Sequence, residues 1–188
     1  MISQAKNRLT LASVLFLLLS ACNVGGRHTP DWKLEANFSQ HEAGFETLLS
    51  RVTVDDKLEM LRANEVRYAG HTFSAAADPS SLALLGLTRE RWLSYSQQLR
   101  ELGIAQVTKS ESGVEFRVDT GSWSNGDSYK GYEYSLAPPE GSRKASLDEY
   151  RLSENDRNRS GDYFICKPLK DNWYLYLSVN AARGQSGQ

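Results

Sequence analysis

Hydrophobic residues recur at helical spacing in the first half of the chain. One stripe at positions i, i+3, i+4 and i+7 predicts an amphipathic helix: Phe45, Leu48, Leu49 and Val52. Ser39 and Glu42 precede this stripe in the capping-box pattern that begins a helix. A second cap-like pattern at 53–56 is followed by Leu58 and Leu61, which predicts a second helix or a kink in the first one.

The most sharply bounded helix is predicted over Thr88–Leu102, where a threonine is the expected N-cap. Gly103 follows, placed to adopt the left-handed conformation that ends many helices, with Ile104 closing on Leu99. A shorter helix is predicted over 80–85, because an Asp-Pro pair precedes it and a glycine follows it.

Beyond Gly103 the hydrophobic period changes from helical to alternating, which is typical of strands. The predicted strands are 104–108, 114–118, 129–136, 163–167 and 173–179. The last two form a predicted hairpin across 170–172. Glu65–Tyr68 also alternates and is either a short strand or an extended link.

Helices followed by strands predict an α+β fold. We expect N-terminal helices packed on one face of a C-terminal antiparallel meander of four to five strands. A single α+β domain would occupy 38–180, preceded by a flexible tether over 22–37 and followed by a disordered tail over 181–188.

The first 22 residues have the pattern of an export signal. Lys6 and Arg8 precede an apolar run over 9–19, which is shorter than the roughly 20 residues that a membrane-spanning helix needs. The run closes on Leu19-Ser-Ala-Cys22, which resembles the lipobox of bacterial lipoproteins. The resemblance implies that 1–21 are a cleaved signal peptide and that the Cys22 thiol carries a diacylglycerol.

A lipid on Cys22 would make the membrane the first partner of the protein, since two or more acyl chains give stable anchoring. Asn23 stands where an aspartate often retains such proteins in the inner membrane, so we expect the outer membrane and its periplasmic face. The alternative is an ordinary secretory signal with a chance cysteine at the cleavage site.

Composition narrows the possible partners. Without 1–21 the chain loses Lys6 and Arg8, and its net charge changes from −1 to −3. No basic patch emerges from that balance, so we expect no nucleic-acid partner. Cys166 is the second of two cysteines, and with Cys22 acylated we expect it to be a buried, unpaired thiol.

Catalytic and metal-binding motifs are not found. His28, His41 and His71 lack metal-ligand spacing, so we expect no metal and no cofactor. The loop 121–126 does not match the nucleophile elbow, which also requires a strand followed by a helix. We therefore favour a protein that is not an enzyme.

Aromatic residues late in the chain are the remaining candidates for a binding surface, because they offer large contact area with a polar tip. The candidates are Trp123, Tyr129, Tyr132, Tyr134, Tyr174 and Tyr176. In the last strand, Tyr174 and Tyr176 lie opposite the predicted buried side that begins at Trp173. The alternative is that helices cover these tyrosines and that they belong to the core.

Together these patterns predict a lipid-anchored envelope protein, a binding or accessory module in the periplasm with a possible protein partner. Two alternatives stay open. One is a periplasmic immunity protein against an antibacterial toxin, and the other is a cell-wall or envelope hydrolase with an unrecognised active site.

Overall fold

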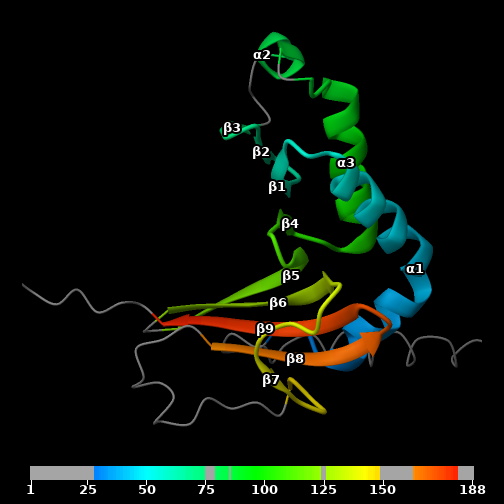
Figure 1. Cartoon of the computed structure of the whole chain (residues 1–188), viewed down its shortest axis with the longest axis vertical. Helices are drawn as coiled ribbons and strands as arrows, with labels where there is room; N and C mark the ends of the chain where they lie inside the picture. The colour runs from blue at the N-terminus through cyan, green and yellow to red at the C-terminus, as the bar shows by residue number, and fades with distance from the viewer. Residues whose placement is uncertain (1–27, 75–78, 85, 124–125, 149–162, 182–188) are drawn as a thin grey trace, which may run out of the picture.

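A computed structural model describes residues 28–74, 79–84, 86–123, 126–148 and 163–181 (Figure 1). Its helices are α1 (Asp31–Val54), α2 (Pro79–Leu84) and α3 (Arg89–Leu102). Its strands are β1 (Leu58–Arg62), β2 (Glu65–Tyr68), β3 (His71–Ser74), β4 (Gln106–Lys109), β5 (Gly113–Trp123), β6 (Gly126–Ser135), β7 (Ser142–Arg143), β8 (Tyr163–Lys170) and β9 (Trp173–Ala181). The strands form one sheet.

The sheet has nine strands in the order β3-β2-β1-β4-β5-β6-β9-β8-β7, and only the β7–β8 pair is parallel. The predicted fold class is therefore wrong: the fold is dominated by one large sheet, not by helices on a meander of four to five strands. Strands β1, β2 and β3 lie between α1 and α2 in sequence and extend the sheet beyond β4 (Figure 1). Glu65–Tyr68, for which the sequence left a short strand and an extended link open, is a strand.

A β-bulge explains why β1 was mistaken for helix. Leu58 pairs with Tyr68 and Leu61 pairs with Val66, although the register shifts between Leu58 and Met60. The extra residue places Leu58 and Leu61 on the same face of the strand, three positions apart. That spacing is also the spacing of one helix face, so periodicity alone could not separate the two structures.

Helix α1 starts earlier than predicted. It begins at Asp31 after Pro30, and the expected cap at Ser39 lies beside a kink at His41 (φ −120°, ψ 20°). The predicted flexible tether is thus wrong from Asp31 onwards, and Leu34 lies in the core at 2 % exposure. The predicted signal peptide, Cys22 and the tail after Ala181 lie outside the described residues.

The prediction for α3 is confirmed at both ends. Thr88 Oγ1 accepts a hydrogen bond from the amide of Arg91 (3.2 Å), which is the N-cap contact. Gly103 adopts φ 67°, where a side chain would be strained, and Ile104 N donates to Leu99 O (2.8 Å). Local signals were sufficient here because the helix ends are set by neighbouring residues.

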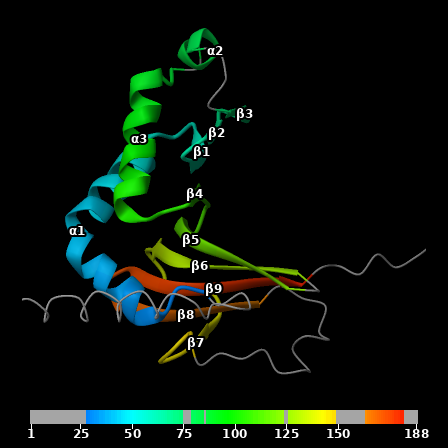
Figure 2. The same ribbon diagram turned by 180° about the vertical axis from the view of Figure 1, so that it is seen from behind.

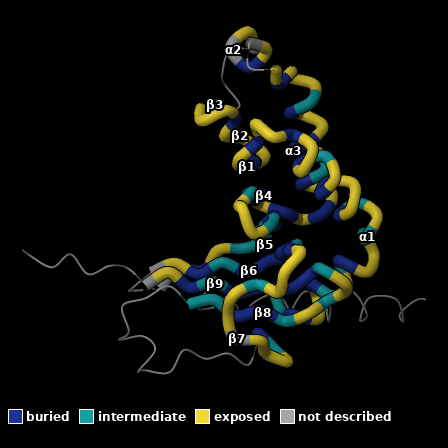
Figure 3. The backbone as a smooth tube through the Cα atoms, in the orientation of Figure 1, coloured by how far each residue is buried: buried dark blue, intermediate teal, exposed yellow. Residues whose placement is uncertain are grey.

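Helix α1 crosses one face of the sheet, the inner face, over β6, β9 and β8 (Figure 2). Rings from α1 and the strands make a continuous aromatic core there: Phe38, Phe45, Phe116, Tyr132 and Trp173. In Figure 3 the buried segments gather in these strands and on the sides of α1 and α3 turned toward them. Burial of these rings stabilises the packing of α1 on the sheet.

The opposite face, the outer face, carries the alternate residues of the same strands. It includes Glu115, Arg117, Tyr129, Glu133, Tyr174 and Tyr176. The segment between β6 and β7 passes over this side of β9 and β8 (Figure 1). A Cβ on Gly141 would lie 2.8 Å from Cδ1 of Phe164, so this segment packs closely against β8. Within the described ranges, this segment covers only part of the outer face.

Candidate functional site

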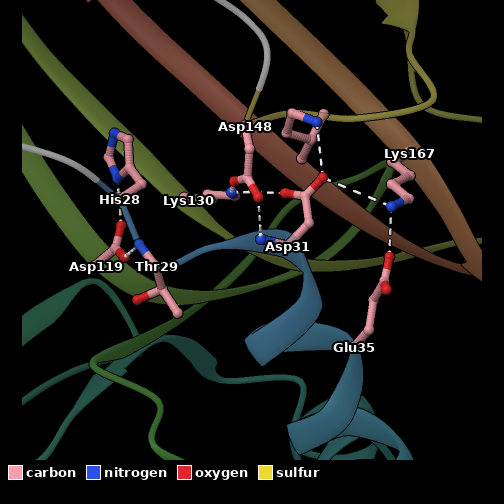
Figure 4. Close-up of polar contacts among 9 residues, drawn as sticks. His28, Thr29, Asp31, Glu35, Asp119, Lys130, Asp148 and Lys167 are labelled. Carbon is pink, nitrogen blue, oxygen red and sulfur yellow. Dashed lines mark hydrogen bonds and ion pairs between the residues drawn. The ribbon is translucent and has the colours of Figure 1, made fainter.

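The start of the described chain is held on the inner face by a polar cluster, which we call the N-terminal clamp (Figure 4). Its members are His28, Thr29, Asp31, Asp119, Ser128, Lys130 and Asp148. Strands β5 and β6 supply Asp119, Ser128 and Lys130 on the inner face. In Figure 4, Asp119 and Lys130 lie beside the residues that lead into α1. The clamp thus fixes the segment before α1 to the sheet.

His28 joins two side chains of the clamp. Its Nδ1 contacts Asp119 Oδ1, and its Nε2 lies 2.7 Å from Ser128 Oγ. Asp119 also accepts a hydrogen bond from the amide of Thr29 (2.6 Å). Burial would raise the pKa of Asp119, but the hydrogen bonds from His28 and Thr29 outweigh it and hold this pKa below its usual value.

Asp119, His28 and Ser128 have the connectivity of a serine hydrolase triad, with the carboxylate on one ring nitrogen and the hydroxyl on the other. Gly121 makes the arrangement possible, because a Cβ there would lie 2.7 Å from Ser128 Oγ. Ser128 is 6 % exposed, however, and lies inside a strand paired on both sides. A nucleophile must be reached by its substrate, so the geometry favours a structural role.

A buried ion cluster forms the other half of the clamp. Lys130 Nζ lies 2.7 Å from Asp31 Oδ1 and 2.6 Å from Asp148 Oδ1, and the lysine is 1 % exposed. Asp31 Oδ2 accepts the amide of Leu147 (2.8 Å), and the amide of Asp31 donates to Asp148 Oδ2 (2.8 Å). Lys167 lies 2.5 Å from Glu35 Oε1 on the next turn of α1.

The ion cluster keeps Asp31 ionised. Burial acts to raise the pKa of the Asp31 carboxyl. The hydrogen bonds from Lys130 and from the amide of Leu147 outweigh this effect, so the pKa of Asp31 lies below its usual value. Buried charges are tolerated only when they are paired and hydrogen-bonded, as they are here. The clamp therefore holds residues 28–31 on the sheet in one fixed arrangement of side chains.

The predicted tyrosines do not form one surface. Tyr132 lies on the inner face at 0 % exposure and donates to Leu34 O (2.9 Å), and burial raises its pKa to about 12. Tyr134 stacks edge-on against Trp173 on the same face. For these two the alternative, that they belong to the core, is confirmed. Trp123 belongs to β5, but its side chain lies outside the described residues.

The other three predicted tyrosines lie on the outer face. Tyr174 and Tyr176 lie opposite Trp173, as the alternation predicts, but both are buried. Tyr129 is partly exposed, and the guanidinium of Arg117 lies 3.7 Å from its ring centroid. Cys166 is also buried on this side and unpaired, as expected, and burial raises the pKa of its thiol.

Sequence reasoning missed a polar group on the outer face. Glu115 and Glu133 are directly opposite each other in the β5–β6 pair, and Arg117 is opposite Gly131. It also missed Lys130 and Ser128, although period two places both on the inner face with Tyr132. The signal in the sequence was Lys130, a charged residue at a strand position that alternation places toward the core.

No family model, curated protein or solved structure matches the chain. Among the described residues, no helix has the length and apolar character needed to cross a membrane. Within those same ranges, no three side chains of the metal-binding types gather in a way that could hold an ion.

Proposed function

We propose that the protein is a lipoprotein of the bacterial envelope, anchored through Cys22, whose domain binds another protein. The observation that carries this proposal is the Leu19-Ser-Ala-Cys22 pattern after a short apolar run. Asn23 favours the outer membrane, with the domain facing the periplasm.

The N-terminal clamp gives this anchor a mechanical consequence. Five residues separate Cys22 from His28, the first residue held on the sheet. A fully extended chain of this length spans at most about 20 Å. The lipid would therefore hold the clamp close to the lipid headgroups. The domain could then move only a short distance away from the membrane surface.

The outer face is the proposed surface for the protein partner, because α1 covers the inner face (Figure 2). Tyr129, Arg117 and Glu115 are partly exposed there and combine aromatic area with charge. Tyrosine and arginine are the residue types most often found at the energetic centre of protein interfaces. Both features fit a binding role better than a purely structural one.

Replacing Cys22 by serine tests the anchor. We expect Cys22→Ser to abolish incorporation of a fatty-acid label and to move the protein from the membrane to the soluble fraction. The matched control is Cys166→Ser, since Cys166 is buried and should not carry lipid. Labelling that persists in Cys22→Ser would refute the anchor.

Site-specific photo-crosslinking in intact cells tests the binding surface. A crosslinking amino acid at Tyr129 should give a discrete product with a second protein, whereas the same group at the exposed Gln40 of α1 should not. Equal products from both positions, or none from Tyr129, would contradict the assignment of the outer face.

The Asp119–His28–Ser128 arrangement supports a second candidate, an envelope acyl hydrolase. Ser128 Oγ would attack an acyl carbon while His28 accepts its proton. A fluorophosphonate probe, which labels activated serines, separates the two candidates. The hydrolase requires labelling that is lost in Ser128→Ala, and the binding module requires that the folded protein stays unlabelled.

A further inference from the structure

Three buried polar atoms without a hydrogen-bond partner lie close together on the outer face. They are Glu133 Oε2, Arg117 Nε and Tyr176 Oη. Within the described part of the chain, other such carboxylates face a cation: Asp31 faces Lys130 and Asp55 faces Arg91. Unsatisfied buried polar groups are uncommon in folded proteins and require an explanation. The guanidinium of Arg117 lies near enough to Tyr176 to act against the rise that burial causes in the pKa of Tyr176, whereas Glu133 has, among the described residues, only the like charge of Glu115 beside it. The carboxylate of Glu133 therefore indicates a missing binding partner.

Strand register brings these side chains together. Glu115 and Glu133 are cross-strand partners in β5 and β6, and Arg117 and Tyr176 both pair with Gly131 from opposite sides. Gly131 is required because a Cβ there would lie 2.1 Å from Phe116 O. Its missing side chain leaves Arg117 and Tyr176 as neighbours across β6. We call Glu115, Glu133, Arg117 and Tyr176 the outer cluster.

The charges of the outer cluster do not balance. Glu115 and Glu133 are like charges directly opposite each other, which destabilises an antiparallel pair. Arg117 lowers the pKa of Glu115 but does not offset the effect of burial, which raises it. Burial, aided by Glu115, raises the pKa of Glu133 to about 7. The cluster therefore lacks one positive charge.

Other titratable groups on this face do not supply that charge. Tyr174 lies opposite Glu133 on β9, and Cys166 lies beside Tyr176 on β8. Arg143 of β7 pairs with Cys166 and acts on its thiol. In the described ranges neither Glu115 nor Glu133 forms an ion pair with any of these side chains.

We propose that the outer cluster binds a basic side chain, an arginine guanidinium or a lysine ammonium, presented by the protein partner. This rests on the proposed function, because it assigns the chemistry of the same surface. The cation would donate to the carboxylates of Glu115 and Glu133, which accept hydrogen bonds. Its charge neutralises the pair, and Glu115, Arg117 and Tyr129 are exposed enough to be reached from solvent.

Binding of a cation is linked to proton release. The bound form requires an ionised Glu133, and this carboxyl is largely protonated below pH 7. Affinity should therefore increase by about tenfold between pH 6 and pH 8, following the ionised fraction of a single group. A partner held by surface charge alone would show a smaller change across this range.

Tri-arginine, tri-lysine and tri-glutamine peptides can test the site by calorimetric titration of the full chain in non-ionic micelles. We expect the two basic peptides to bind and the neutral one not to bind. Glu133→Gln and Glu115→Gln should each weaken binding at least tenfold, and Glu133→Gln should also remove the pH dependence. The matched control is Glu111→Gln, which changes an exposed carboxylate in the turn before β5.

Three outcomes would overturn the proposal: no binding of the basic peptides, unchanged binding in Glu133→Gln, or an equal loss in Glu111→Gln. Circular dichroism of each variant checks folding, which should be intact because a neutral Gln removes a repulsion. Failure of the proposed function is seen separately, since loss of Cys22 lipidation would not affect peptide binding. Failure of this inference alone would leave crosslinks from Tyr129 unchanged in Glu133→Gln.

Discussion

Lys130 provides the sharpest test of the N-terminal clamp. Its ammonium lies 2.7 Å from Asp31 Oδ1 and is 1 % exposed. In Lys130→Met the side chain keeps a similar length but the buried carboxylate loses its main cation. Removing one partner of a buried ion pair costs about 3–5 kcal/mol. Because the amide of Leu147 still donates to Asp31, we expect the lower end, about 3 kcal/mol.

Urea unfolding followed by tryptophan fluorescence measures this cost, since Trp173 lies in the core. Lys170→Met is the matched control, because Lys170 pairs with Glu42 at the exposed surface and should change stability little. Adding Asp31→Asn to Lys130→Met removes the stranded charge and should recover most of the loss. Equal stability of Lys130→Met and Lys170→Met would refute the clamp as a stabilising feature.

Three further predictions concern single positions. Glu133→Gln should be more stable than the original chain at pH 8, by at most about 3 kcal/mol before solvent screening reduces it, and equally stable near pH 4. The original chain loses stability as the pH rises from 4.5 through 7, because the pKa of Glu133 is raised to about 7 in the folded state. Unfolding curves at the two pH values check it, and a loss at pH 8 would contradict it. Gly121→Ala should speed amide exchange of Thr29, because its Cβ would lie 3.1 Å from His28 Nε2, while exchange in α3 stays unchanged. Gly103→Ala should cost about 1–2 kcal/mol in thermal unfolding, because its φ of 67° is strained for any residue with a Cβ.

The sequence predicted those elements whose ends are determined locally. Helix α3 has its cap, stripe and terminal glycine within one continuous segment, and the β8–β9 hairpin turns across Asp171, where φ is positive. Strand β1 was missed because its bulge mimics the spacing of a helix. The start of α1 was missed because Leu34 precedes the capping pattern and lies within the predicted tether over 22–37.

The clamp could not be predicted because its contacts join distant residues. Asp31 and Asp148 are 117 positions apart, and His28 and Asp119 are 91 apart. Alternation correctly placed Tyr174 and Tyr176 on the face opposite Trp173. It could not show that Tyr132 and Tyr134 lie on the other face of the sheet, since that depends on the register between β6 and β9.

Mass spectrometry of the N-terminal peptide of the purified membrane-associated protein can show whether Cys22 carries a lipid. We expect a chain that begins at Cys22 and carries the mass of a diacylglyceryl group on that residue. A chain that begins elsewhere, or that begins at Cys22 with a free thiol, would contradict it.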